Sequence, residues 1–168
     1  MLSVLFTHTI DKYLTHYSFH DTNISPYKFN YEPSRAGVAQ DTFLEHVYKR
    51  LRYDFHSKYL HKILKQSYDR NWKRIIRQAK HCKDPHLYYG GFVDYDDSPR
   101  RGSKGMLMKG TTPAKFEKYL RQLLQISSSQ NKEYVFITAW NEWGEGAYLE
   151  PDTTNRYAYL EALKKSFD

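Results

Sequence analysis

Hydrophobic residues follow two different periods in the second half of the chain, and each period predicts an element. Runs of β-branched and aromatic residues at positions 85–93 and 134–138 predict buried strands. Between them, Thr112 caps and Pro113 opens a predicted helix, whose apolar face carries Phe116, Leu120, Leu123 and Leu124. A last predicted helix carries Ala158, Leu160, Leu163 and Phe167. The order strand, loop, helix occurs twice, so the sequence predicts an α/β fold with parallel strands and outer helices.

The first half of the chain predicts fewer elements. Residues 1–9 and 27–31 have the composition of short strands, and the second of these ends at Glu32 and Pro33. Asp41 caps a predicted helix with an apolar stripe, formed by Phe43, Leu44, Val47, Tyr48 and Leu51. A helical pattern continues from residue 60 to Ser67, and a further stripe contains Trp72, Ile75, Ile76 and Ala79. Residues 1–28 otherwise show no sustained period, whereas residues 101–109, basic and glycine-containing, predict a mobile flap.

The predicted strand at residues 134–138 leads into a loop rich in acidic and aromatic side chains. Glu142 and Glu145 lie three residues apart in this loop, beside Asn141 and two tryptophans. Enzymes that act on glycosidic bonds use one protonated and one ionised carboxyl group, and tryptophan rings stack on sugars or exclude water from a glutamate. The pattern indicates a carbohydrate-active site. The alternative is a structural loop with core tryptophans and solvated turn glutamates.

Two blocks of residues resemble one known family. The first block is Trp140-Asn141-Glu142-Trp143-Gly144-Glu145-Gly146-Ala147-Tyr148-Leu149-Glu150-Pro151-Asp152. It resembles the closing signature of the WbsX-type lipopolysaccharide glycosyltransferases, which belong with the glycoside hydrolase family 99-like proteins. The second block, residues 94–102, resembles the family's Trp-Asp-Asn-Thr-Pro-Arg motif, with Tyr95, Asp97 and Ser98 standing where Trp, Asn and Thr would be. Residues 29–33 resemble more faintly the family's Phe-Glu-Pro strand end.

The resemblance implies a (β/α)8 TIM-type barrel with its site at the carboxyl ends of the strands. It implies that Glu142 is the base that deprotonates a sugar 2-hydroxyl and that Glu145 is the general acid on the leaving oxygen. The residues expected to bind the sugar are Asn141, Trp140, Trp143, Tyr95, Asp96, Arg100, Glu32, Tyr148 and Glu150. For Asp96 and Arg100 the alternative is an ion pair with each other that shapes the loop; for Glu32 it is a simple turn acid. This chemistry requires neither a metal nor a cofactor.

The length of the chain is short for that barrel. A (β/α)8 barrel takes about 250 residues, whereas this chain has 168. We therefore expect residues 1–168 to be one partial domain, the carboxyl-terminal part of a barrel, with open strand edges that favour self-association. The resemblance implies a glycosyltransferase or glycosidase of lipopolysaccharide or other surface-polysaccharide biosynthesis. The alternative is a truncated, non-catalytic sugar-binding remnant of such an enzyme.

The formal net charge of +7 adds a further expectation, because much of the excess lies in residues 49–83. The overall charge is typical of proteins that meet nucleic acid, an anionic membrane face or a phosphorylated substrate. The stretch itself is either a solvated helix face or a basic surface that holds the protein near anionic lipid. No nucleic-acid module is recognisable, and no stretch reaches the roughly 20 apolar residues of a membrane span. We expect a cytoplasmic protein, soluble or peripheral at the inner membrane face, whose partner is a glycan or a lipid- or phosphate-linked sugar.

Cysteine and histidine change the picture little. Cys82 is the one cysteine, so no internal disulfide forms. His8, His16 and His20 show no diagnostic metal-ligand spacing, and we expect ordinary surface histidines.

Overall fold

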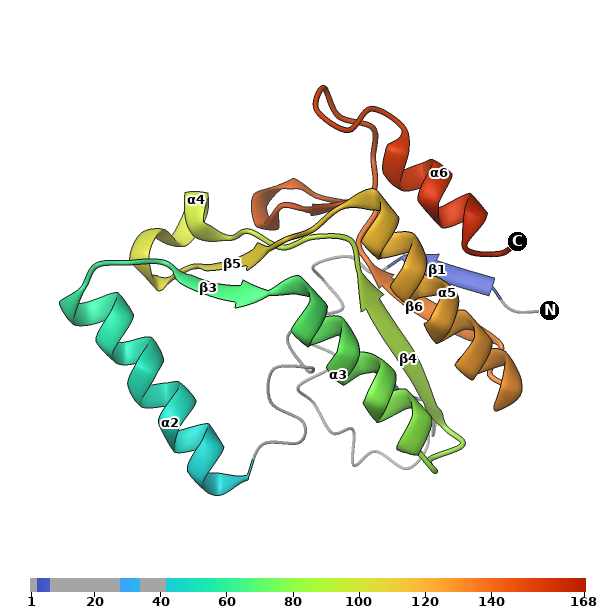
Figure 1. Ribbon diagram of the computed structural model, residues 1–168, viewed down its shortest axis with the longest axis horizontal. Coiled ribbons are helices and arrows are strands. Elements are labelled where there is room, and N and C mark those ends of the chain that lie inside the picture. Colours follow the sequence, from blue (N-terminus) through green and yellow to red (C-terminus); the bar gives the residue numbers. More distant parts are fainter. Residues whose placement is uncertain (1–2, 7–27, 34–41) are drawn as a thin grey trace, which may run out of the picture.

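The main layer of the fold is a parallel sheet. The computed structural model defines residues 3–6, 28–33 and 42–168. Its four-stranded sheet consists of β1 (Ser3–Phe6), β2 (Lys28–Phe29), β4 (Leu87–Phe92) and β6 (Tyr134–Thr138). The spatial order is β1-β6-β4-β2, and every neighbouring pair is parallel. The predicted parallel arrangement is therefore confirmed for the strands of this sheet (Figure 1).

Helices pack against this sheet and join its strands. α3 (Tyr68–His81) and α5 (Pro113–Ser129) lie side by side against β4 and β6, and α6 (Ala158–Lys165) packs on α5 (Figure 1). α5 begins as predicted, because the Thr112 hydroxyl accepts a hydrogen bond from the Lys115 N–H at 3.2 Å. Since α5 connects the parallel neighbours β4 and β6, the α/β class is confirmed.

The core forms where α3 and α5 meet the sheet. Trp72 of α3 is fully buried and stacks on Phe92 of β4, with ring centroids 5.5 Å apart, and on Tyr119 of α5 at 5.8 Å. Gly91 allows this close approach, because a Cβ atom at that position would lie 2.6 Å from the Trp72 ring. The rest of the predicted stripe on α3 is buried as well, at Ile75, Ile76 and Ala79. An aromatic core thus fixes both helices to β4.

A second, two-stranded sheet occupies segments for which we predicted something else. β3 (Leu64–Ser67) pairs in parallel with β5 (Met106–Lys109). The helical pattern predicted up to Ser67 is wrong, because burial along β3 alternates with a period of two residues. The mobile flap predicted at residues 101–109 is also wrong. That segment forms the end of α4 (Ser98–Arg101), the turn η2 (Gly102–Lys104) and the strand β5.

The helix α2 (Phe43–Asp54) confirms the predicted helix but presents its apolar residues to solvent. Thr42, rather than Asp41, caps it: the Thr42 hydroxyl accepts the Glu45 N–H at 3.3 Å, and the Glu45 carboxylate accepts the Thr42 N–H at 2.9 Å. The exposed side chains of the stripe are Phe43, Leu44, Tyr48 and Leu51, with Phe43 81% exposed. A turn of π-helix, η1 (Phe55–Tyr59), follows. The stripe is therefore separate from the core described above.

The two ends of the chain match the predictions in part. β1 and β2 lie within the two predicted amino-terminal strands and are shorter, whereas His8, His16 and His20 lie outside the described residues. α6 ends at Lys165, so Phe167, predicted on its apolar face, lies beyond the helix and is exposed. In the described part of the chain, no helix combines the length and the apolar character needed to cross a membrane.

Candidate active site

Three strand ends bring acidic residues to one edge of the sheet. Carboxyl ends of parallel strands share an edge, which is where open α/β sheets bind ligands. β2 is followed by Glu32, β4 by Asp94, and β6 by the loop that contains Glu142 and Glu145. Glu32 is 1% exposed, and a Cβ atom at Gly90 of β4 would lie 3.2 Å from its Cγ. This edge is the candidate site.

Glu145 is, like Glu32, a fully enclosed carboxylate of the site. It ends the short turn η3 (Trp143–Glu145) and is 1% exposed. Its Oε1 accepts a hydrogen bond from Arg100 Nη2 at 2.7 Å, and its backbone carbonyl accepts the Asp96 N–H at 2.7 Å. The motifs at residues 94–102 and 140–152 are therefore in direct contact. Glu145 is buried, so the alternative of a solvated turn residue is wrong for it.

Gly146 makes that junction sterically feasible. Its φ is +57°, and a Cβ atom there would lie 3.1 Å from the Asp96 backbone nitrogen. The Asp96–Arg100 ion pair that we weighed as an alternative does not form. Asp96 Oδ1 instead accepts the Ser98 N–H at 2.9 Å, and Arg100 reaches across to Glu145.

Glu142 lies in different surroundings from Glu145. It belongs to the strand β7 (Asn141–Glu142), which pairs antiparallel with β8 (Ala147–Tyr148). Its side chain is partly exposed, whereas Asn141 is exposed. One carboxylate is thus buried against a guanidinium while the other is partly exposed, a contrast that allows two carboxyl groups to play different roles.

An aromatic surface lies beside these carboxylates. Trp143 is 51% exposed and stacks on Tyr148 with ring centroids 3.8 Å apart and an interplanar angle of 17°. Its Nε1–H donates to Glu150 Oε2 at 2.7 Å, and the Tyr148 hydroxyl donates to Asp152 at 3.1 Å. Trp140 differs, because it is partly buried and packs against the core. Of the two tryptophans in this loop, Trp143 is therefore the one with an exposed ring.

Tyr95 and Asp97 support the site from inside. Tyr95 is 5% exposed and its hydroxyl donates to Asp97 at 3.3 Å, so it presents little ring surface to a ligand. Asp97 is 1% exposed and also accepts hydrogen bonds from the Met106 N–H at 2.6 Å and from Arg101 at 3.1 Å. The negative charge that Asp97 brings to this motif is thus matched by Arg101.

Asp94 is a functional candidate that the sequence analysis missed. Its Oδ1 accepts hydrogen bonds from the Tyr95 N–H at 2.7 Å and from the Thr111 hydroxyl at 2.8 Å. Burial raises the pKa of Asp94 above its ordinary value of 3.8, against the effect of these hydrogen bonds. The available signal was its position, directly after a predicted strand.

The raised pKa of Asp94 predicts a sign for the pH dependence of stability. The folded state holds this proton more tightly than the unfolded state, so its contribution is fully present below pH about 3.8 and is lost as pH rises through the folded pKa. Asp94→Asn should remove this loss. The free energy of unfolding of the variant, relative to that of wild type, should therefore rise between pH 4 and pH 7. Denaturant unfolding at the two pH values measures it.

Asp69→Asn is the matched control with the opposite sign. Hydrogen bonds from Lys115 at 2.7 Å and from Tyr119 at 2.8 Å lower the pKa of Asp69. Its stabilisation is therefore present above the unfolded pKa and is lost as pH falls through the folded pKa. The free energy of unfolding of Asp69→Asn, relative to that of wild type, should accordingly decrease as pH rises toward neutral. Parallel pH profiles for the two variants would contradict both assignments.

These features define an α/β protein with a carboxylate-rich site at the carboxyl ends of its parallel strands. The family model described as Glycosyltransferase WbsX matches residues 7–163, and the chain belongs to that family. Two relatives, both named "Uncharacterized protein WxcX" and from two strains of Xanthomonas campestris pv. campestris, are 34% identical over 101 residues. The match covers 57% of this chain and 14% of each relative, so the chain spans a small part of their length. No solved structure matches the chain.

The described residues contain no group of three or more histidine, cysteine, aspartate or glutamate side chains arranged to hold a metal ion. The contacts of the site run instead between carboxylates, arginines and aromatic rings.

Proposed function

We propose that this chain is the catalytic part of a carbohydrate-active enzyme that acts on a glycosidic bond in surface-polysaccharide biosynthesis. The observation that carries the proposal is the pair of glutamates in contrasting surroundings, Glu145 buried against Arg100 and Glu142 partly exposed. Membership of a family described as a glycosyltransferase supports it. Exposed Trp143, stacked on Tyr148, supports it further, because an open aromatic face suits a sugar ring.

The proposed reaction uses each glutamate twice, once in each of its two steps. Glu142 takes the proton of the sugar 2-hydroxyl, whose oxygen then attacks the anomeric carbon as the bond to the leaving oxygen breaks. Glu145 gives a proton to that leaving oxygen. Water or an acceptor hydroxyl then opens the strained intermediate at the anomeric carbon, while Glu145 takes the proton of that nucleophile and Glu142 returns its proton to the sugar 2-oxygen. The choice between water and an acceptor hydroxyl decides between hydrolysis and transfer.

Arg100 adds a requirement to this scheme. As a general acid Glu145 carries a proton, and its ion pair with Arg100 at 2.7 Å is then lost. We propose that the bound substrate draws Arg100 away with its own anionic or hydroxyl oxygens. Arg100 is therefore assigned as a substrate-binding residue that pairs with Glu145 until the substrate arrives.

We also propose that the sheet is an arc of a (β/α)8 barrel. The neighbours β2, β4 and β6 are parallel and occur in chain order, with helices in the connections between them, as successive barrel strands do. The greater length of the relatives is consistent with further strands from elsewhere in a longer chain. A structure of such a chain in which β2, β4 and β6 belong to an open sheet would contradict this.

The test of the function measures glycan binding and turnover together. Trp143→Ala should weaken binding of oligosaccharides by up to about tenfold, the value of one lost aromatic stacking contact of roughly 0.5–1.5 kcal/mol. Phe43→Ala is the matched control, because it removes an aromatic ring that is 81% exposed on α2, outside the site. Ligand-observed NMR reports binding, and chromatography of products reports turnover.

The outcomes separate the proposal from its alternative. Binding that depends on Trp143 together with sugar release or transfer supports the enzyme. Binding of the same specificity with no turnover of any glycoside by the full-length polypeptide favours the non-catalytic sugar-binding module. Equal binding by Trp143→Ala and Phe43→Ala contradicts the placement of the site.

A further inference from the structure

A basic pocket lies between α2 and α3, and its described lining shares no residue with the candidate active site. Its volume is about 350 Å³, within the range of small-molecule sites. Six cationic residues line it, and no acidic residue is among its described lining residues: Lys49, Arg52, Lys65, Arg70, Arg74 and Lys109. Five of these six belong to the basic stretch at residues 49–83. The fold therefore places part of that positive charge around one cavity, which a merely solvated helix face would not require.

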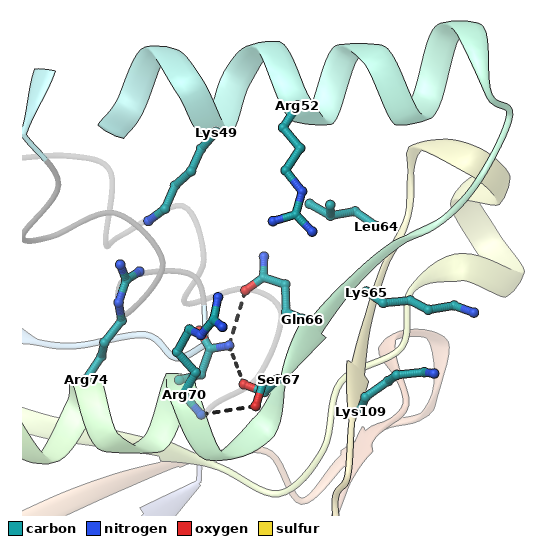
Figure 2. Close-up of a pocket in the computed structure, with 10 residues that line it drawn as sticks. Lys49, Arg52, Leu64, Lys65, Gln66, Ser67, Arg70, Arg74 and Lys109 are labelled. Atoms are coloured by element: carbon teal, nitrogen blue, oxygen red, sulfur yellow. Dashed lines mark hydrogen bonds between the residues drawn. The ribbon is translucent and has the colours of Figure 1, made fainter. Parts of the chain in front are cut away.

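The directions of the side chains concentrate charge in the cavity. Lys49 and Arg52 extend from α2, and Arg70 and Arg74 extend from α3 toward them (Figure 2). Lys65 and Lys109 project from the ends of β3 and β5 away from the space between the helices (Figure 2). Four cations thus converge from two helices.

The acidic residues on the surrounding elements are committed to other contacts. Glu45 of α2 accepts the Thr42 N–H, and Asp54 of α2 pairs with Arg50 and Lys58. Asp69 of α3 binds Lys115 and Tyr119. Within residues 42–168, Arg52 and Arg70 have no carboxylate within ion-pair distance. Arg52 and Arg70 face the same cavity and repel each other, so an anion bound in the cavity would relieve this repulsion.

The floor of the pocket adds hydrogen-bond donors. Ser67 caps the amino terminus of α3, a helix of 14 residues, where the helix dipole favours an anion. Gln66 projects into the cavity between Arg52 and Arg70 (Figure 2), and Leu64 is the one apolar residue of the described lining. Arginine forks match the paired oxygens of phosphate groups. The lining therefore suits a compact polyanion and offers little to an apolar ligand.

We propose that this pocket binds a diphosphate group, the chemical group that activates a sugar for transfer or links it to a carrier. The choice of diphosphate rests on the proposed function, whereas the anion site rests on the pocket itself. Its source is either a soluble nucleoside diphosphate sugar or a lipid-linked diphosphate sugar, and the two share the group that the arginines recognise.

The experiment measures binding of inorganic pyrophosphate to the full-length chain by isothermal titration calorimetry. Arg52→Gln and Arg70→Gln should each weaken binding by about tenfold to a hundredfold, as loss of a charge-assisted hydrogen bond predicts. Lys80→Gln is the control, because it removes the same charge from the exposed last turn of α3 outside the pocket. Arg52 and Arg70 come from different helices, so misfolding of one variant leaves the other informative.

Two further arms identify the source of the group. Competition of pyrophosphate by uridine diphosphate, without binding to vesicles, assigns a soluble donor. Pyrophosphate-sensitive binding to vesicles that contain polyprenyl diphosphate, against phosphatidylcholine vesicles, assigns a lipid-linked sugar. Absence of pyrophosphate binding, or equal weakening of binding by Lys80→Gln, overturns the assignment of this pocket as a diphosphate site. Pyrophosphate binding is read without turnover, so failure of the glutamate chemistry leaves this result standing and is distinguished from it.

Discussion

Glu145→Gln is expected to lower turnover by about 10²–10⁴-fold, equivalent to roughly 3–5 kcal/mol of transition-state stabilisation, while sugar binding stays measurable. The substitution preserves the shape of the side chain and an oxygen that can accept from Arg100 Nη2, now 2.7 Å from Oε1. It removes the proton that the leaving oxygen requires. Glu142→Gln should cause a loss of the same order, because the other proton transfer then fails. Steady-state kinetics with a glycoside that wild type turns over measures both.

The controls for this prediction come from the same chain. Glu133→Gln removes an exposed carboxylate just before β6, on the opposite edge of the sheet from the site, and should retain wild-type turnover. The double variant Glu142→Gln/Glu145→Gln should be little worse than the poorer single variant, since residues that act as a unit are not additive. Full activity in both single variants would remove the glutamates from the mechanism.

Arg100→Gln tests whether Arg100 binds the substrate or takes part in the reaction. It takes the guanidinium from Glu145 and leaves both carboxylates in place. A higher KM with nearly unchanged kcat fits an arginine that holds substrate in both ground and transition states. A loss as large as that of Glu145→Gln would instead make Arg100 part of the reacting group.

β6, α5 and α6 were predictable because each shows a strong local signal, whereas β5, in the same part of the chain, was not. The run at residues 134–138 is β-branched and aromatic, and α5 has both a capping threonine and a proline at its start. The acidic and aromatic residues of the loop motif at residues 140–152 are also visible in the local sequence alone. Signals of this kind lie within a few residues of each other, where periodicity and capping rules apply.

The contacts that build the site were not predictable in the same way. Arg100 and Glu145 are 45 residues apart in the chain, and the local alternative, an Asp96–Arg100 pair, was as reasonable by spacing. β3 and β5, each four residues long, are too short for their period to be read, so their pairing depends on tertiary structure. The stripe of α2 has a helical period, yet no local rule states whether such a stripe faces a core or solvent.

Trp72→Ala is expected to lower the free energy of unfolding by about 3–5 kcal/mol, the usual cost of truncating a buried aromatic residue to alanine. Trp72 is fully buried between Phe92 and Tyr119, with edge contacts to Tyr68 and Phe116. Its loss leaves a cavity where α3, α5 and β4 meet. Domains are commonly stable by only about 5–15 kcal/mol, so this variant should unfold at much lower denaturant concentration or fail to fold.

Trp143→Ala provides the opposite case within the same chain. Trp143 is 51% exposed, so its removal should change the free energy of unfolding by under about 1 kcal/mol while it weakens glycan binding. Denaturant unfolding followed by near-UV circular dichroism measures both variants under two-state conditions. If Trp72 stabilises the core and Trp143 contacts the sugar, Trp72→Ala should lower the free energy of unfolding and Trp143→Ala should weaken glycan binding with little effect on stability. Equal destabilisation by the two substitutions would mean that Trp143 is itself part of the core, and that it acts by packing instead of by contact with sugar.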